Sequence, residues 1–273
     1  MKKIPLFLIL FSLNQITLHS QVRFGINLGY NTPWAQTSMT DGNIIIYSNG
    51  VRDIEVFDFS FGKGYEYGAF LTFGGNDGLQ FNMKFSFLDG TVNTQSLIFE
   101  NNQGVNLVKY ESQMLWINPS IKFQLNSKRK FRPFINIGPS VGLLGKISRK
   151  EDFQSNNGQF ETKIVYSSSM PIAITSGLGI EYHPPKNANF FITLNLQNTS
   201  GSYYPTRGEV TSYVIDGTDL LNTLTESQRK IFYKRKYTVN PNVPTDQNKP
   251  KLAQRVPYPF SSFGFSLGIG YKF

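Results

Sequence analysis

The feature that most constrains the fold of this chain is a strict alternation of apolar and non-apolar residues. In residues 22–30 every even-numbered residue is apolar, and every odd-numbered residue is arginine, glycine or asparagine. A period of two over this length predicts a β-strand with one apolar face. The same alternation predicts seven further strands, at residues 65–73, 79–87, 115–125, 131–143, 170–182, 190–196 and 263–273.

The charged residues inside these strands all fall on the face opposite the apolar series. They are Arg23, Glu66, Lys84, Lys122, Arg132, Lys146, Glu181 and Lys272. The rest of that face is mostly glycine and neutral polar residues. Glycine in a strand usually marks tight space or a close approach of another group. This face therefore predicts a narrow, crowded interior.

Two kinds of barrel place an apolar face differently. A soluble lipocalin-like barrel turns it inward, and a membrane barrel turns it outward around a polar interior. The connections alternate between short ones (74–78, 126–130, 184–189) and long ones (31–64, 88–114, 148–169, 198–262). Membrane barrels have short periplasmic turns and long extracellular loops. We therefore predict an all-β fold, an eight-stranded antiparallel up-and-down transmembrane β-barrel in the outer membrane with both termini periplasmic.

The N-terminus has the order of a secretory signal peptide. Lys2 and Lys3 precede an apolar run at residues 4–13 and a more polar stretch that ends near Ser20. The apolar run is too short to span a bilayer as a helix, which needs roughly 20 residues. We expect a signal peptide at residues 1–20 and one barrel domain at residues 21–273, with residues 198–262 as a long extracellular loop.

Several stretches resemble a known family. Residues 115–123 (LWINPSIKF), 132–142 (RPFINIGPSVG), 177–182 (GLGIEY) and 267–273 (LGIGYKF) are similar to small outer-membrane β-barrel proteins of Bacteroidota, the PorT-like group. The resemblance implies an outer-membrane location and a C-terminal aromatic residue, Phe273, that the barrel-assembly machinery reads. It implies no catalytic activity, because the group has no shared catalytic motif.

Composition argues against several classes of function. The chain has no cysteine and only two histidines, so thiolate chemistry and a histidine-based metal or catalytic site lack their residues. His183 adjoins Pro184 and is interpreted as a solvated turn residue. Asp216 and Asp219 do not have the spacing of an EF-hand. The formal charge of +9 suggests binding to nucleic acid. An exported protein does not encounter genomic DNA or cytoplasmic RNA, so we expect no nucleic-acid partner. We predict no enzyme activity and no cofactor.

The charges on the interior face have a structural interpretation. Eight strands leave an interior that side chains can fill, and buried charges are usually paired. We predict a charge plug in the lumen, with Glu66 near Lys84 and Arg132 near Glu181. Its residues are Glu66, Lys84, Lys122, Arg132 and Glu181. The alternative is a narrow passive channel for small solutes.

The last long loop is the best candidate for a binding function. Near-helical spacing predicts a helix over residues 219–232 with Asp219 as its N-cap, followed by an extended proline-rich stretch. Its basic residues, Arg229, Lys230, Lys234, Arg235 and Lys236, are either a solvated surface or a patch for lipopolysaccharide phosphates or an envelope protein partner. The sequence thus predicts a non-enzymatic protein with a structural or interaction role at the cell surface or in an envelope or secretion complex.

Overall fold

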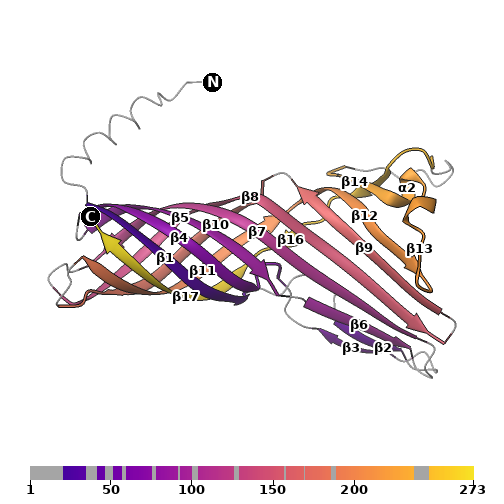
Figure 1. The fold of residues 1–273 in the computed structure, drawn as a ribbon, viewed down its shortest axis with the longest axis horizontal. Coiled ribbons are helices and arrows are strands. Elements are labelled where there is room, and N and C mark those ends of the chain that lie inside the picture. The colour runs from indigo at the N-terminus through magenta and orange to yellow at the C-terminus, as the bar shows by residue number, and fades with distance from the viewer. Residues whose placement is uncertain are drawn as a thin grey trace.

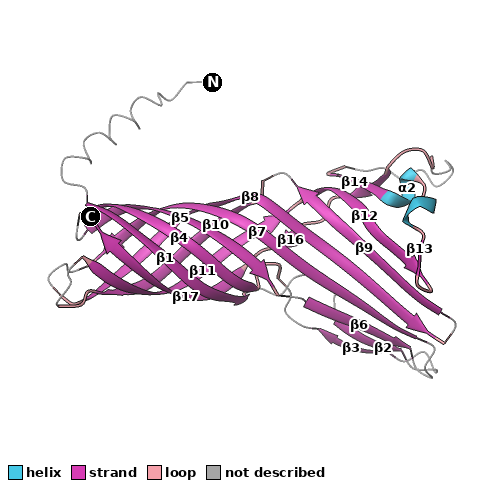
Figure 2. Ribbon diagram, in the orientation of Figure 1, coloured by secondary structure: helices cyan, strands magenta, loops and turns pink. Residues whose placement is uncertain are grey.

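The computed structural model shows a closed β-barrel from which a second sheet projects at one end (Figures 1 and 2). It describes residues 21–34, 42–46, 52–56, 60–75, 78–91, 93–99, 104–125, 129–156, 158–168, 170–185, 189–236 and 246–273. The expected signal peptide at residues 1–20 lies outside the described residues. Among the described residues, no helix is long and apolar enough to cross a membrane.

Eight strands form the barrel. They are β1 (Gln21–Pro33), β4 (Gly64–Gly74), β5 (Gly78–Gly90), β7 (Gly104–Gln124), β8 (Phe131–Ser155), β10 (Ile172–Tyr182), β11 (Phe190–Tyr203) and β17 (Ser262–Lys272). Each pairs antiparallel with the next in this order, and β17 pairs back with β1. The closed order satisfies the backbone groups without an edge inside the barrel. The predicted eight-stranded antiparallel barrel is confirmed.

The apolar series faces outward. Ile135, Leu178 and Leu267 are 60%, 59% and 53% exposed, whereas Arg23 and Glu181 on the other face are 1% and 0% exposed. The outward residues form a continuous apolar belt around the barrel, as the membrane-barrel interpretation predicted. A charged residue in such a belt would cost about 2–4 kcal/mol at the bilayer midplane.

The interior is as narrow as the glycines predicted. A Cβ atom at Gly270 would lie 2.3 Å from the ring of Phe191, which fills that part of the lumen. One at Gly264 would lie 1.7 Å from the side-chain oxygen of Asn31. A side chain at either position would displace the neighbouring side chain from its place in the lumen.

A β-bulge at Leu143 reverses the two faces of β8. Leu115 pairs with Leu144 but Trp116 pairs with Gly142, so Leu143 is the extra residue. Beyond the bulge Leu144 and Lys146 are exposed. The prediction that Lys146 faces the lumen is therefore wrong, because the alternation continues in sequence while the pairing shifts by one.

The prolines inside the strands do not cause this bulge. The register is the same on both sides of Pro119 and Pro139, with Ile117 opposite Val141 and Ile121 opposite Ile137. Neither proline therefore shifts the register of its strand.

The long connections are largely β-structure. Strands β7 and β8 continue beyond the barrel, and the 25 residues of β8 span about 80 Å at the usual rise. They form an extension sheet with seven further strands. These are β3 (Arg52–Val56), β2 (Gly42–Ile46) and β6 (Asn93–Phe99) on the β7 side, and β9 (Gly158–Ser168), β12 (Pro205–Ile215), β14 (Lys230–Lys234) and β15 (Lys251–Gln254) on the β8 side.

The segment expected as one long loop, residues 198–262, is mostly ordered. Its first residues still belong to β11, and it contains β12, β13 (Thr218–Asp219), β14, β15 and β16 (Tyr258–Pro259). The helix predicted over residues 219–232 is wrong: the structure has the 3-10 helix η2 (Leu221–Thr223) and the short helix α2 (Glu226–Arg229) before β14. Pairing of β14 with β12 gives the aromatic and β-branched residues there a strand environment.

Candidate functional site in the lumen and on the extension sheet

A buried carboxylate organises the end of the lumen near the chain termini. Glu181 on β10 is fully buried. Arg23 donates from Nη1 to Glu181 Oε2 at 3.2 Å, and Lys122 forms an ion pair with Glu181 Oε1. Gln124 also donates to this carboxylate, and His183 Nε2 lies 3.2 Å from it. We call these five residues the Glu181 cluster. Buried charges are costly unless they are paired, and in this cluster the carboxylate of Glu181 is paired with both cations, Arg23 and Lys122.

The same cluster also contacts the short connection that follows β4 at this end of the barrel. Arg23 donates from Nη2 to the backbone oxygen of Gly75 at 3.0 Å and from Nη1 to Gln124 Oε1 at 2.8 Å. Gln80 Nε2 donates to the same Gly75 oxygen at 2.8 Å. Lys122 Nζ lies 4.3 Å from the centre of the Phe134 ring. Side chains from β1, β5, β7, β8 and β10 therefore fill the cross-section.

Two sequence expectations are corrected here. Arg132 is opposite Glu181 in the register, but its Nε donates to the backbone oxygen of Arg129 at 3.2 Å, and Glu181 takes Arg23 and Lys122 instead. His183 is buried, at 5% exposed, and stacks on Phe191 at 5.6 Å between ring centres. It is therefore not a solvated turn residue.

A second ion pair lies toward the other end of the lumen. Glu66 and Lys84 form it, as the diagonal placement of the two residues suggested. Asn31 and Gln197 donate to Glu66 Oε2 at 3.0 and 2.6 Å, and Lys84 Nζ donates to Gln197 Oε1 at 2.9 Å. The amide of Asn31 occupies the space that Gly264 leaves open.

A polar chamber separates the two charged groups. It has a volume of about 50 Å³, and Lys84, Lys122, Asn27, Asn136 and Asn195 are among its lining residues. Side chains of adjacent strands also form hydrogen bonds around it, for example from Thr72 on β4 to Asn82 on β5 at 2.8 Å. The lumen is thus a network of polar side chains with a small chamber.

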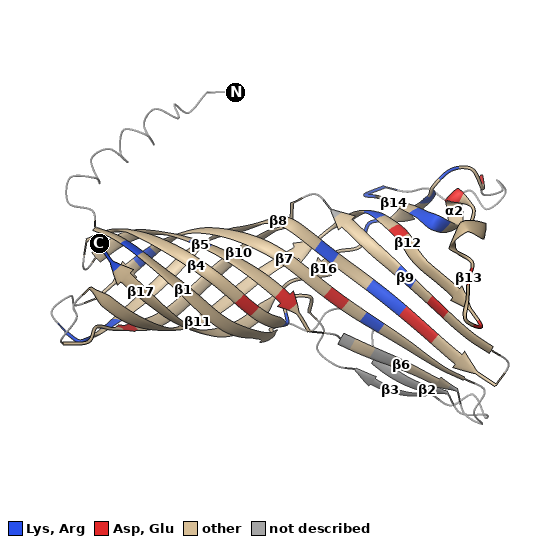
Figure 3. Ribbon diagram, in the orientation of Figure 1, with Lys and Arg blue, Asp and Glu red and all other residues tan. Residues whose placement is uncertain are grey.

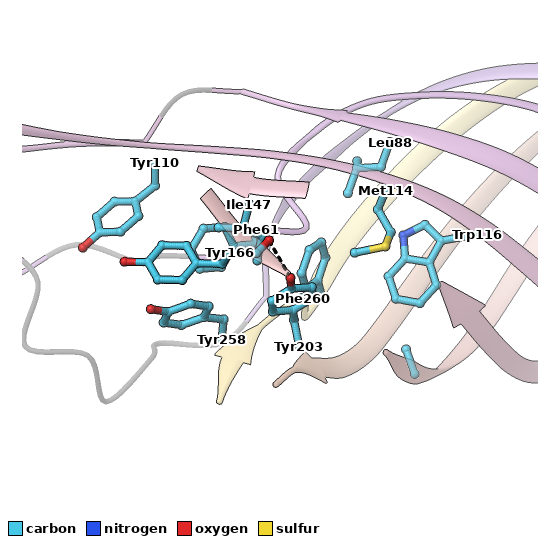
Figure 4. Close-up of a cluster of buried hydrophobic side chains, with 11 residues drawn as sticks. Phe61, Leu88, Tyr110, Met114, Trp116, Ile147, Tyr166, Tyr203, Tyr258 and Phe260 are labelled. Carbon is cyan, nitrogen blue, oxygen red and sulfur yellow. Dashed lines mark hydrogen bonds between the residues drawn. The ribbon is translucent and has the colours of Figure 1, made fainter. Parts of the chain in front are cut away.

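An aromatic cap covers the lumen where the extension sheet begins (Figure 4). It consists of Phe61, Trp116, Tyr203, Tyr258 and Phe260, all 8% exposed or less. The ring centres of Trp116 and Phe260 are 5.8 Å apart, and those of Phe61 and Phe260 are 6.0 Å apart. Tyr203 Oη donates to the backbone oxygen of Tyr166 at 2.9 Å. Trp116 occupies an even position on β7, so its side chain lies inside the barrel wall.

Two further tyrosines, Tyr166 and Tyr233, pack beside Tyr258 of the cap on the extension sheet. Burial raises the pKa of Tyr166, Tyr233 and Tyr258 above the usual value for a phenol. The rings of Tyr166 and Tyr258 meet edge to face, with centres 5.5 Å apart. These hydroxyls remain neutral donors and acceptors over the physiological pH range.

The five basic residues singled out in the last long connection lie at or next to α2 and β14, and β14 pairs with the part of β12 nearest the barrel (Figure 3). We call them the basic tip. Arg229 pairs with Glu209 at 3.5 Å, and Lys230 pairs with Glu226 at 2.9 Å. Lys234, Arg235 and Lys236 are exposed and form no ion pair within the described part of the chain. The basic tip therefore presents three free cations and two that are partly neutralised.

The C-terminal Phe273 and the two aspartates Asp216 and Asp219 each take part in a backbone hydrogen bond. Phe273 follows β17, is 74% exposed, and its backbone N donates to the oxygen of Val22 at 2.9 Å. Asp219 Oδ1 accepts from the backbone N of Leu221 at 2.9 Å, and Asp216 Oδ1 accepts from that of Gln159 at 2.7 Å. Within the described ranges, no group of three or more His, Cys, Asp or Glu residues is placed to hold a metal ion.

Gln80, Gln124, Asn31 and Gln197 are the site residues that the sequence did not single out. They are neutral, so they do not stand out among the charged residues of the interior face. The alternating pattern nevertheless places them on that face. What they bind depends on cross-barrel neighbours, which no local pattern gives.

No protein-family model matches the sequence, and no curated protein matches it. Among solved structures, the chain is similar to Neisserial surface protein A (NspA), with a TM-score of 0.40, 9% identity, and 93% of this chain and 97% of that one covered. It is also similar to Ail, the attachment invasion locus protein of Yersinia pestis, with a TM-score of 0.31, 12% identity and the same coverage.

Proposed function

We propose that this protein is a non-enzymatic outer-membrane β-barrel with a structural or interaction role at the cell surface, in an envelope or secretion complex. The observation that carries the proposal is that the lumen is filled while β7 and β8 continue outside the barrel as an ordered sheet. A filled barrel suits an anchor, and a sheet fixed to that anchor by unbroken strands suits a surface for partners.

The orientation follows from the two ends of the barrel. Both the start of β1 and the end of β17 lie at the end with the short connections, since Gln21 pairs with Gly74 and Arg23 with Lys272. Short turns are periplasmic in barrels of this class. Both termini are then periplasmic, and the extension sheet is extracellular.

Other features support the envelope setting. The apolar belt fits the outer-membrane lipid, and the exposed Phe273 after the last strand fits a signal for the barrel-assembly machinery. The PorT-like resemblance of the sequence supports a role in an envelope or secretion complex. The basic tip supplies exposed cations for an envelope protein partner.

A photo-crosslinking residue tests the interaction role. Thr211 is exposed on β12 of the extension sheet, and Ile135 is exposed in the apolar belt. In outer membranes, we expect a crosslinker at Thr211 to form an adduct with a defined envelope protein, and one at Ile135 to form none. Adducts from neither position would contradict the interaction role.

The competing function is a narrow passive channel for small solutes. The Glu181 cluster and the aromatic cap fill the lumen on either side of the polar chamber, so we expect no steady conductance from the purified protein in planar bilayers. A stable solute conductance, abolished by enlarging a lumen side chain, would favour the channel instead.

A further inference from the structure

A polar groove lies on the extension sheet just beyond the apolar belt. It has a volume of about 410 Å³. Its lining residues are Asp89, Gly90, Glu111, Ser112, Gln113, Lys146, Ser148 and Lys163. The belt on β8 ends at Leu143 and Leu144, which are 40% and 71% exposed. The groove therefore begins where the hydrocarbon-facing surface stops.

The bulge in β8 creates this groove. Unbroken alternation would turn Lys146 into the lumen, as the sequence analysis predicted. The extra residue at Leu143 instead places Lys146 on the outer face, opposite Gln113 of β7. Lys146 lies two residues beyond Leu144, about 7 Å along the strand.

The two lysines of the groove share it with two carboxylates but are not in direct contact with either of them. Neither Lys146 nor Lys163 forms an ion pair with any residue that the structure describes. Lys163 also lies directly opposite Lys150, whose Nζ is taken by Glu161 at 3.0 Å. Like charges opposite each other in a sheet are unfavourable, so an anion in the groove would relieve their repulsion.

The two carboxylates of the groove are held by neutral donors. Ser148 Oγ donates to Glu111 Oε2, and Gln113 Nε2 donates to Asp89 Oδ1, each at 3.3 Å. They face the same space as the lysines. A phosphate bound by the lysines and a divalent cation bound between phosphate and carboxylate would both be accommodated, because hard cations prefer oxygen ligands.

We propose that this groove binds the phosphorylated headgroup of an outer-leaflet lipid, with Lys146 and Lys163 on the phosphate and the acyl chains on the belt at Leu143 and Leu144. The continuity of groove and belt selects a lipid over a free anion. The proposal rests on the proposed outer-membrane location. The lipid site is distinct from the basic tip, which lies at α2 and β14 beside β12.

Native mass spectrometry of the full-length protein, released from micelles that contain diphosphorylated lipid A, tests the proposal. We expect the unmodified protein to retain one lipid A, and the double variant Lys146→Gln/Lys163→Gln to retain it at least about tenfold less. The control Lys234→Gln/Arg235→Gln removes the same charge at the basic tip and should retain lipid A normally. Lipid A without phosphates should not be retained, and inorganic phosphate should not displace the bound lipid.

Folding of each variant is checked by its heat-sensitive mobility on gels, and Lys146→Arg/Lys163→Arg, which keeps the charge, should retain the lipid. Equal retention by the glutamine variant, or loss in the basic-tip control alone, would overturn the proposal. Displacement by inorganic phosphate would assign the groove to a free anion instead. If the protein fractionates with the outer membrane but retains no lipid A, this proposal fails and the proposed function stands; absence from that fraction overturns both.

Discussion

At the scale of single residues, the arrangement of side chains in the lumen depends on which partners surround each buried charge. Glu181 has three cationic or potentially cationic neighbours and one amide, drawn from β1, β7 and the end of β10. The parity of each position in the alternating pattern was enough to predict that Glu181, Lys122 and Arg23 face inward. It was not enough to predict their pairing, because Arg23 and Glu181 are 158 residues apart in the sequence.

Replacing Glu181 tests this arrangement. Glu181→Gln leaves the charges of Arg23 and Lys122 without a buried counterion, which costs about 3–5 kcal/mol of unfolding free energy. Glu161→Gln breaks the ion pair with Lys150 on the half-exposed sheet surface, and its cost should be about 1 kcal/mol or less. Urea unfolding in detergent micelles measures both. Equal effects would mean that Glu181 is not the centre of the plug.

The tyrosines near the cap give a pH dependence. The pKa of Tyr166, Tyr233 and Tyr258 is raised in the fold above that of an unfolded phenol, which is about 10. The protonated form is therefore favoured by folding. This contribution to stability is complete below about pH 10 and is lost as the pH rises through the higher folded values.

Ultraviolet titration of tyrosinate checks this directly. We expect an exposed group of tyrosines to ionise first and a second group to ionise only at higher pH, together with loss of the cap. The variant Tyr166→Phe/Tyr233→Phe/Tyr258→Phe should lack most of the second group. A titration of all tyrosines in a single step near the usual pKa of a phenol, about 10, would contradict the burial of these hydroxyls.

At the scale of secondary-structure elements, the eight barrel strands were predictable because a half-apolar strand has a period of two. The ends of β7 and β8 were not, because their continuations carry polar residues on both faces outside the belt. The bulge at Leu143 was also beyond local reasoning, since only the pairing with β7 reveals the shift. The helix expected at residues 219–232 failed for a related reason: tertiary pairing with β12 overrides the local spacing.

Deleting Leu143 tests the bulge. Without the extra residue, the part of β8 beyond it must invert its faces or slip against β7, and the fully buried Ile147 would turn outward. We expect a loss of at least about 2 kcal/mol in unfolding free energy, the value of burying one such side chain. Limited proteolysis should then cleave the extension sheet more readily. Leu143→Ala keeps the bulge, and because Leu143 is 40% exposed it should behave like the unmodified protein.

At the scale of the whole molecule, the fold is defined by closure of the barrel and by the outward direction of its apolar face. Alternating short and long connections predicted the barrel, but the extension sheet was not predicted because loop length alone does not distinguish coil from strands. The result is a filled barrel that carries a sheet on one end only. Membrane location, orientation and the role of that sheet all depend on which surface meets lipid.

Accessibility of single introduced thiols measures this most directly, because the chain contains no cysteine. Ile135→Cys places a thiol in the belt, and Thr211→Cys places one on the extension sheet. On intact cells, the account predicts that a water-soluble maleimide labels Thr211→Cys and leaves Ile135→Cys unlabelled, whereas a membrane-soluble maleimide labels Ile135→Cys. Ready labelling of Ile135→Cys by the water-soluble reagent in the folded protein, or labelling of Thr211→Cys only after the outer membrane is permeabilised, would contradict it.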